Sequence, residues 1–95
     1  MLFVVTAFDR PGAAELRARH RPAHLEYLKG RANQIRAGGA MLDSDEQPIG
    51  SLLIIEAADR AAAEALVAGD PFRTEGVFER VEVRPWRAVL GSWIG

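Results

Sequence analysis

The sequence predicts a single α+β domain with the element order βαββαβ. Its 95 residues are too few for two independent cores, since domains usually need on the order of 100 residues each. Short apolar runs rich in β-branched residues alternate with stretches whose apolar residues recur at helical spacing. The two halves of this order share one plan, which is typical of a ferredoxin-like domain with a four-stranded antiparallel sheet and both helices on one face.

The first half is predicted to form a strand and a long helix. Residues 2–8 are β-branched and aromatic, and the turn signal of residues 9–12 closes them. A helix begins near Ala13 and restarts at Arg21-Pro22, because proline fits a first helical turn and breaks an interior. Beyond the restart, four apolar residues keep helical spacing: Leu25, Leu28, Ala32 and Ile35. We therefore expect this helix to end at Gly38-Gly39.

The next segment is predicted to form a hairpin and a second helix. Residues 40–43 and 50–57 are the strands, and the polar residues 44–48 connect them. Asp59 can cap a helix over residues 61–68, whose alanine-rich sequence allows a close approach to the sheet.

The last segment is predicted to form a short helix and a strand. Asp70-Pro71 is a cap followed by a first-turn proline, so a helix runs from there to about Glu75. Alternating valines and charged residues predict the final strand over residues 77–86, and a tail covers about 87–95. One domain over residues 1–95 is the expected organisation.

Composition limits the classes of partner and chemistry. Twelve basic and thirteen acidic side chains leave a net charge of −1, without the basic excess that nucleic acids or anionic membranes attract. The chain has no cysteine, which excludes disulfides, thiolate nucleophiles and cysteine-based metal sites. The apolar opening run lacks a basic leader and soon meets Asp9-Arg10, so we expect neither a signal peptide nor a membrane span. A cytoplasmic protein is the expectation.

Both faces of the predicted sheet are apolar. In the first strand, Leu2, Val4 and Phe8 share one face, and Phe3, Val5 and Ala7 share the other. Residues 52–55 are likewise apolar on both sides. Two helices can cover only one face, and large exposed apolar patches are rare on monomers. We therefore expect a homodimer in which the open sheet faces pack together.

Two histidines and two aspartates are the candidates for proton transfer, because histidine titrates near neutral pH. His24 follows Pro22 by two residues and is expected in the first turn of a helix. There the positive end of the helix dipole keeps the imidazole neutral and able to accept a proton. The alternative is a surface histidine without a role. His20 and His24 are spaced for a shared metal ion, but the expected break at Pro22 separates them, and no metal ion or cofactor is predicted.

The aspartates have structural and functional interpretations. Asp70 can cap a helix, and Asp9 ends a strand at the sheet edge where α/β proteins tend to place their sites. The sequence leaves open which of them meets His24. Three arginines could hold a substrate carboxylate or could form a solvated helix face: Arg17, Arg19 and Arg21. Ser51 is a weak donor candidate, and the two tryptophans are expected to pack a tail or a subunit edge.

Several segments in order resemble the YciI-like (YCII-related) family over nearly the whole chain. They are Phe3-Val4-Val5 leading to Asp9, Arg21-Pro22-Ala23-His24-Leu25, Ala37-Gly38-Gly39, Gly50-Ser51-Leu52-Leu53-Ile54, Gly69-Asp70-Pro71-Phe72, Gly76-Val77 and Val83-Arg84-Pro85-Trp86. The resemblance implies a dimeric α/β barrel and a His-Asp acid/base pair in a pocket. By position, the histidine is His24, the aspartate is Asp70 or Asp9, and Phe72 joins the arginines and Ser51 as a substrate-binding candidate. The acidic connection over residues 42–46 departs from better-known members.

The resemblance also implies lyase or isomerase chemistry, because one relative removes chloride from a chlorinated hydroquinone and muconolactone isomerase has a similar fold. We therefore hypothesise a cofactor-free enzyme in which His24 moves a proton on a small cyclic or aromatic organic acid. Asp70 or Asp9 orients the histidine, and an arginine holds the anionic group. The alternative is a non-catalytic dimer that binds a small ligand or acts as a scaffold. A third hypothesis is a cofactor-independent monooxygenase of the same barrel architecture.

Overall fold

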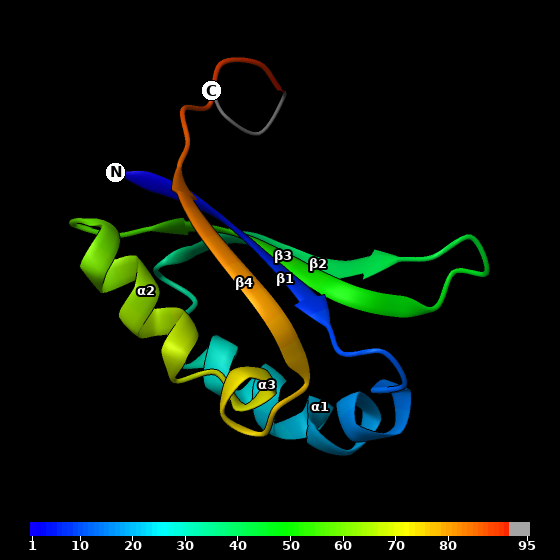
Figure 1. Ribbon diagram of the computed structural model, residues 1–95. Helices are drawn as coiled ribbons and strands as arrows, with labels where there is room; N and C mark the ends of the chain where they lie inside the picture. The colour runs from blue at the N-terminus through cyan, green and yellow to red at the C-terminus, as the bar shows by residue number, and fades with distance from the viewer. Residues whose placement is uncertain (92–95) are drawn as a thin grey trace.

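Figure 1 shows the computed structural model, which describes residues 1–91. The elements in chain order are β1 (Leu2–Asp9), α1 (Ala14–Lys29), β2 (Ile35–Leu42), β3 (Pro48–Glu56), α2 (Arg60–Ala68), α3 (Pro71–Thr74) and β4 (Phe78–Pro85). This order confirms the predicted βαββαβ plan, with α3 as the short additional helix. The last part of the predicted tail, residues 92–95, and Trp93 within it lie outside the described residues.

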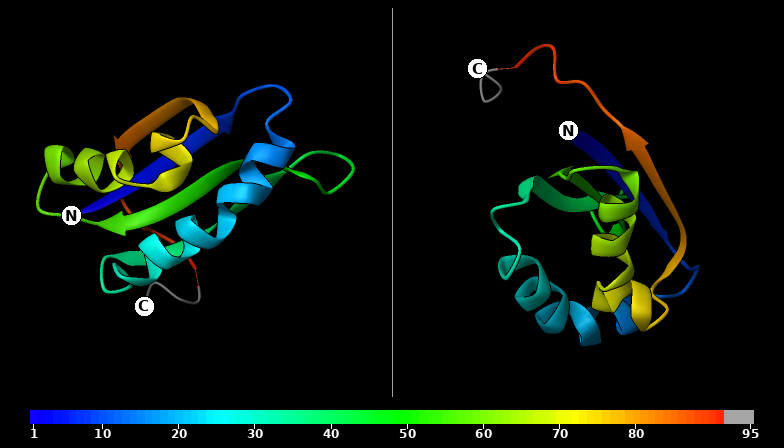
Figure 2. Two further views of the ribbon diagram at one scale, coloured as in Figure 1. Left: turned by 90° about the horizontal axis from the view of Figure 1, so that it is seen from below. Right: turned by 90° about the vertical axis from the view of Figure 1, so that its left-hand side faces the viewer.

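The four strands form one antiparallel sheet in the order β2-β3-β1-β4. The central strand β1 places Phe3 opposite Ile55 of β3 on one side and opposite Pro85 of β4 on the other. The helices lie on one face of this sheet, as the two views of Figure 2 show. The predicted α+β, ferredoxin-like architecture is therefore confirmed.

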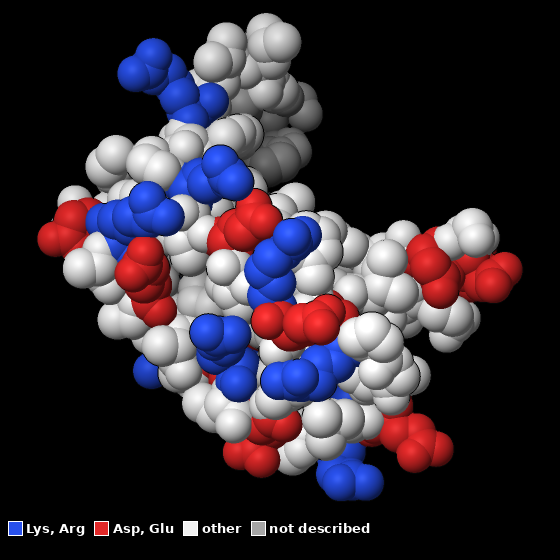
Figure 3. Space-filling model, in the orientation of Figure 1, with Lys and Arg blue, Asp and Glu red and all other residues white. Residues whose placement is uncertain are grey.

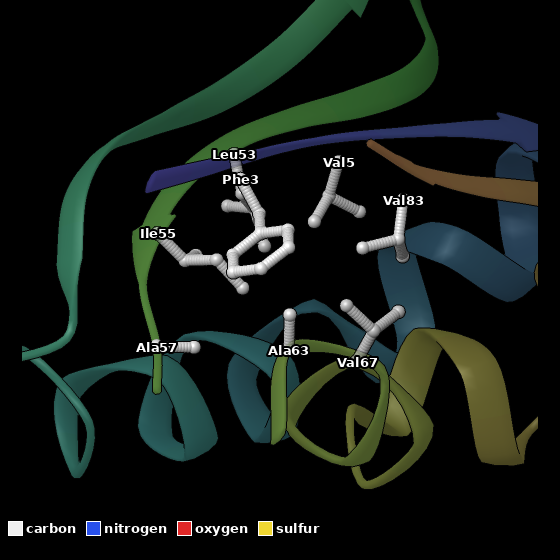
Figure 4. Packing of buried hydrophobic residues seen from close by; sticks show 8 residues of the cluster. All are labelled: Phe3, Val5, Leu53, Ile55, Ala57, Ala63, Val67 and Val83. Carbon is white, nitrogen blue, oxygen red and sulfur yellow. The ribbon is translucent and has the colours of Figure 1, made fainter. Parts of the chain in front are cut away.

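The main core lies between the sheet and α2 (Figure 4). Its buried residues are Phe3, Val5, Leu53, Ile55, Ala57, Ala63, Val67 and Val83. Ala63 is completely buried, because its small side chain lets α2 approach the sheet closely. Asp59 caps this helix by accepting the backbone N–H of Ala62 at 2.8 Å, as the sequence predicts.

The expected helix restart at Pro22 is wrong. One helix, α1, runs continuously from Ala14 to Lys29 with Pro22 inside it. Proline removes the hydrogen bond to the carbonyl of Ala18, four residues earlier. Both residues are exposed, so water can take the place of the missing donor.

The expected end of the helix at Gly38-Gly39 is also wrong. The chain leaves α1 after Lys29, and residues 35–39, predicted as helix and stop signal, belong to β2. Gly38 is paired with Leu53 of β3, and the β2 ladder extends from Ile35 to Leu42. Pairing with β3 satisfies the backbone groups of this segment, so tertiary structure overrides its helical spacing.

The second face of the sheet carries no helix of the described part of the chain (Figure 2). Apolar side chains remain partly exposed on the sheet and its β2–β3 hairpin, with 51% of Leu42, 49% of Ile49 and 37% of Leu52 accessible. No helix among the described residues is both long enough and apolar enough to span a membrane.

Charges of both signs cover the face that carries α2, α3 and β4 (Figure 3). Arg60 pairs with Glu64 and Arg84 pairs with Glu82, each at 3.0 Å. These exposed pairs are solvated and interspersed, so this face presents no stripe of one charge.

Candidate active site

A cavity of about 430 Å³ lies between α1 and the β2–β3 side of the sheet. Its far wall is made of small residues of β2, because Gly38 and Ala40 are paired with Leu53 and Ser51 and share their helix-covered face. A Cβ atom on Gly38 would lie 2.6 Å from Cδ2 of Leu53, so a larger residue there would have to displace the end of the Leu53 side chain. The small residues on this part of β2 leave space between the sheet and α1.

Helix α1 is held by polar side-chain contacts with three other parts of the chain: the end of β1, the residue that caps α3, and helix α2. The contacts come from Arg17, His24 and Tyr27, which are spread over about three turns of the helix. The hydroxyl of Tyr27 donates to the carbonyl of Leu66 at 2.7 Å. These contacts fix which face of α1 lines the cavity.

His24 and Asp70 form a buried hydrogen-bonded pair at the cavity wall. Nδ1 of His24 lies 2.7 Å from Oδ1 of Asp70, and the residues are only 7% and 2% exposed. Asp70 also caps α3, since the same Oδ1 accepts the backbone N–H of Phe72 at 2.9 Å. The sequence left open whether Asp70 or Asp9 meets His24, and the structure places Asp70 there.

The second ring nitrogen of His24 is accessible. A carboxylate can only accept, so Nδ1 carries the hydrogen of this bond and Nε2 of the neutral ring is the free acceptor. Nε2 makes no hydrogen bond within residues 1–91, and no fully buried side-chain N or O in that range lacks a partner. It follows that Nε2 is reachable by solvent, and His24 lines the cavity.

Phe72 holds the imidazole plane. Its ring stacks on His24 with centroids 3.8 Å apart and an interplanar angle of 10°. The guanidinium carbon of Arg17 lies 4.6 Å from the centroid of the same ring. Phe72 is buried and lines the cavity, so this predicted binding residue packs against the two polar groups of α1.

The expectation that His24 lies in a first helical turn is wrong. Since α1 begins at Ala14, His24 is in its interior and the dipole at the helix start does not reach it. The carboxylate of Asp70, rather than the helix dipole, sets the tautomer of the ring.

Arg17, Asp9 and Ser51 form a second buried cluster. Nη1 of Arg17 donates to both carboxylate oxygens of Asp9, at 2.8 and 2.9 Å, and Nη2 donates to Oγ of Ser51 at 3.0 Å. Burial raises the pKa of the Asp9 carboxyl above its ordinary value of 3.8, although the charge and hydrogen bonds of Arg17 oppose the rise. Asp9 is thus the partner of Arg17.

Arg21 lies at the cavity, whereas His20 lies apart from it. The exposed Arg21 is on the cavity wall formed by α1. His20 points to Glu75, with 4.0 Å between Nε2 and Oε1. The two histidines share one helix but have different partners, and within residues 1–91 no three His, Cys, Asp or Glu side chains gather closely enough to hold a metal ion.

Comparison with known proteins places the chain in a family. The family model of the YCII-related domain matches residues 1–87. The chain belongs to the YCII-related family. Protein YciI of Escherichia coli and that of Shigella flexneri are each 33% identical to it over 98 residues, which cover 95% of this chain and 100% of theirs.

Solved structures agree with this membership. The YCII-related chain is similar to 5-chloro-2-hydroxyhydroquinone dehydrochlorinase (TftG) from Burkholderia phenoliruptrix, solved in complex with 2,5-dihydroxybenzoquinone, with 35% identity and a TM-score of 0.86 over 92% of this chain and 94% of that one. An antibiotic biosynthesis monooxygenase structure is 22% identical with a TM-score of 0.55 over 95% of this chain and 100% of that one. The second likeness concerns the fold alone.

Several features of this YCII-related site could not be predicted from the sequence patterns. Lys29 lines the cavity, but in the sequence it is only a charged residue near a predicted helix surface. Gly38 and Ala40 shape the cavity because they lie on β2. Ala40 falls in the predicted strand over residues 40–43. The helical spacing of Ala32 and Ile35, by contrast, conceals the first part of β2, which includes Gly38. The small size of Gly38 and Ala40 was the available signal for the cavity. A strand without bulky side chains leaves space over its face.

A larger hollow of about 800 Å³ lies between α2 and β4. Its polar lining consists of exposed charged residues such as Arg60, Glu64 and Arg84. None of the predicted site residues lines it. The chemistry-bearing side chains therefore gather at the smaller cavity beside His24.

Proposed function

We propose that this protein is a cofactor-free enzyme of the lyase or isomerase type that acts on a small cyclic or aromatic organic acid. His24 moves the proton and Asp70 orients it. The observation that carries the proposal is the 2.7 Å contact between Nδ1 of His24 and Oδ1 of Asp70, in a ring that lines a cavity. A buried carboxylate on one nitrogen leaves the other nitrogen as a positioned base.

The chemistry follows from this arrangement. Nε2 of His24 takes a proton from substrate in the cavity, and the imidazolium that forms is stabilised by the negative charge of Asp70. In an elimination, the electron pair of the broken C–H bond forms the new double bond and the leaving group departs with its own bonding pair. In an isomerisation, Nε2 returns the proton to a different atom of the substrate.

The family supports the class of substrate. TftG, at 35% identity, is a dehydrochlorinase that acts on a chlorinated hydroxyhydroquinone and was solved with a dihydroxybenzoquinone. A ring of this size suits a cavity of about 430 Å³. We therefore extend to this chain the class of small, oxygenated rings, without committing to one compound.

A turnover screen tests the proposal. The purified chain is offered lactones and halogenated phenols or hydroquinones, and product or chloride release is measured. Positioned proton transfer contributes about 10² to 10⁴ in rate, so His24→Ala should be at least about 100-fold slower than wild type. His20→Ala is the control and should keep wild-type turnover.

The alternative is a ligand-binding or scaffold protein without catalysis. It shares the cavity but predicts saturable binding without product. Equal turnover by wild type and His24→Ala would remove His24 from the chemistry, whereas saturable binding without any product would favour the alternative.

We also propose that the protein is a cytoplasmic homodimer. The sheet face without helices is apolar along β1 and β3, where Val4 and Leu52 lie, and a second copy would cover it. Light scattering at micromolar concentration should give twice the mass of one chain. A mass of one chain would contradict the dimer.

A further inference from the structure

The cavity contains positive charge that the described chain does not balance. Among residues 1–91, three cationic side chains line it, Arg17, Arg21 and Lys29, and none of the lining residues is acidic. Arg17 is balanced by Asp9, which it binds through both carboxylate oxygens. Within residues 1–91, neither Arg21 nor Lys29 has a carboxylate oxygen within 4.0 Å. Two positive charges therefore remain for a ligand.

These two cations are far apart along α1. They are eight positions apart, at 21 and 29, which corresponds to about 12 Å of helix. The side chains of Leu25 and Leu28 lie between them on the cavity wall. The wall thus presents a cation, an apolar stretch and a second cation in that order.

The opposite wall consists of small and apolar residues together with Ser51. Gly38 and Ala40 of β2 contribute almost no side chain, and Leu53 of β3 lies beside Gly38. A planar ring can lie between this wall and the leucines of α1 with little loss of contact. His24 lies between Arg21 and Lys29 in the sequence of α1, so its accessible Nε2 is expected to face the middle of such a ring.

We propose that the cavity binds a cyclic dianion, with one anionic group at Arg21 and the other at Lys29. The ring lies between Leu25, Leu28 and the β2 wall, with its reacting atoms near His24. The inference rests on the proposed function, because it names the substrate class of that site. It gives Lys29 a binding role and leaves Arg17 as a cation already neutralised by Asp9.

Binding of two commercial acids tests whether the cavity recognises two anionic groups on one ligand. Terephthalate carries an acid group at each end of its ring and benzoate carries one, and both are titrated calorimetrically into the full chain. The variants are Arg21→Gln, Lys29→Gln and the double substitution, with Arg19→Gln as matched control because Arg19 is exposed and does not line the cavity.

We expect terephthalate to bind about tenfold or more tightly than benzoate, since a second charge-assisted contact is worth on the order of tenfold in affinity. Each single variant should weaken the binding of terephthalate about tenfold and the double variant about 100-fold, because the effects of substitutions at separate sites on the binding free energy add. Benzoate should lose affinity in one single variant only. Arg19→Gln should change neither acid.

Three results would overturn the proposal of a bound dianion: no saturable binding of terephthalate, equal affinity for the two acids, or a single variant that leaves the affinity for terephthalate unchanged. Arg21 and Lys29 are exposed, so their glutamine variants should fold, and circular dichroism checks this. The proposed function fails separately. It is contradicted when His24→Ala turns over at the wild-type rate, whatever the acids do.

Discussion

His24 and Asp70 are joined through one carboxylate oxygen that also begins a helix. Oδ1 of Asp70 is 2.7 Å from Nδ1 of His24 and 2.9 Å from the backbone nitrogen of Phe72. The cap fixes this oxygen relative to α3, and the oxygen in turn fixes the imidazole. Orientation of the proposed base is therefore a consequence of how α3 begins.

Substitutions of Asp70 should separate charge from geometry. Asp70→Asn keeps an oxygen that can accept from both partners but removes the charge that stabilises the imidazolium. Turnover should fall at least about tenfold with a loss of stability of about 1 kcal/mol. Asp70→Ala removes the cap as well, so its free energy of unfolding should fall by about 1–3 kcal/mol. Urea unfolding and turnover measure both quantities, and full turnover by Asp70→Asn would contradict the assigned role.

Loss of Arg17 should leave a buried charge behind. Arg17→Met removes the partner of the Asp9 carboxylate, and breaking a buried ion pair in this way costs about 3–5 kcal/mol. The double variant Arg17→Met, Asp9→Leu should recover most of this loss because both charges are gone. Arg19→Met, on the exposed face of α1, is the control. If the double variant is no more stable than Arg17→Met, the pairing does not explain the loss.

Asp9 should make stability depend on pH. Its pKa is raised above 3.8 by burial in the folded chain, so the folded chain binds this proton more tightly than the unfolded chain does. The contribution of Asp9 to stability is therefore fully present below pH 3.8 and is lost as the pH rises through the raised pKa. Urea unfolding of wild type and Asp9→Asn across this window should show the wild-type advantage falling with pH. An advantage that grows with pH would have the wrong sign.

Filling the cavity should abolish binding without unfolding the protein. Ala40 lines the cavity and is exposed in it, so Ala40→Leu adds a side chain to open space and should change stability by less than about 1 kcal/mol. Ligand affinity or turnover should fall at least about tenfold, because the added side chain would occupy the space that the ring of the ligand needs. Ala61→Leu, on the exposed side of α2, is the matched control. Unchanged binding by Ala40→Leu would place the ligand elsewhere.

The order of elements could be predicted because most of them carry local signals. The β-branched run of β1, the alanine-rich sequence of α2 and the cap at Asp70 each determine their own structure. Residues 30–39 were the exception. Their apolar spacing fits a helix, but pairing of β2 with β3 decides their conformation, and such long-range pairing leaves no local signal.

The site could be predicted only in part for the same reason. The candidates His24, Asp70, Asp9 and Arg17 could be identified from residue type and family resemblance. Which aspartate meets His24 depends on how α1 crosses the sheet, because Arg17 and His24 lie two turns apart and meet different strands and turns. The position of Lys29 and Ala40 at the cavity can be recognised only when the space between α1 and β2 is known.

Nitrogen-15 NMR of the histidine rings is the most direct test of the hydrogen bond between His24 and Asp70, because it reports which nitrogen of His24 carries the proton. In the neutral form of the ring, we expect Nδ1 to carry the hydrogen and Nε2 to carry none, a pattern that Asp70→Ala changes and Asp9→Asn leaves as it is. His20 supplies an internal reference in the same spectra. A wild-type ring protonated at Nε2, or one that responds to Asp9→Asn and not to Asp70→Ala, would contradict the account.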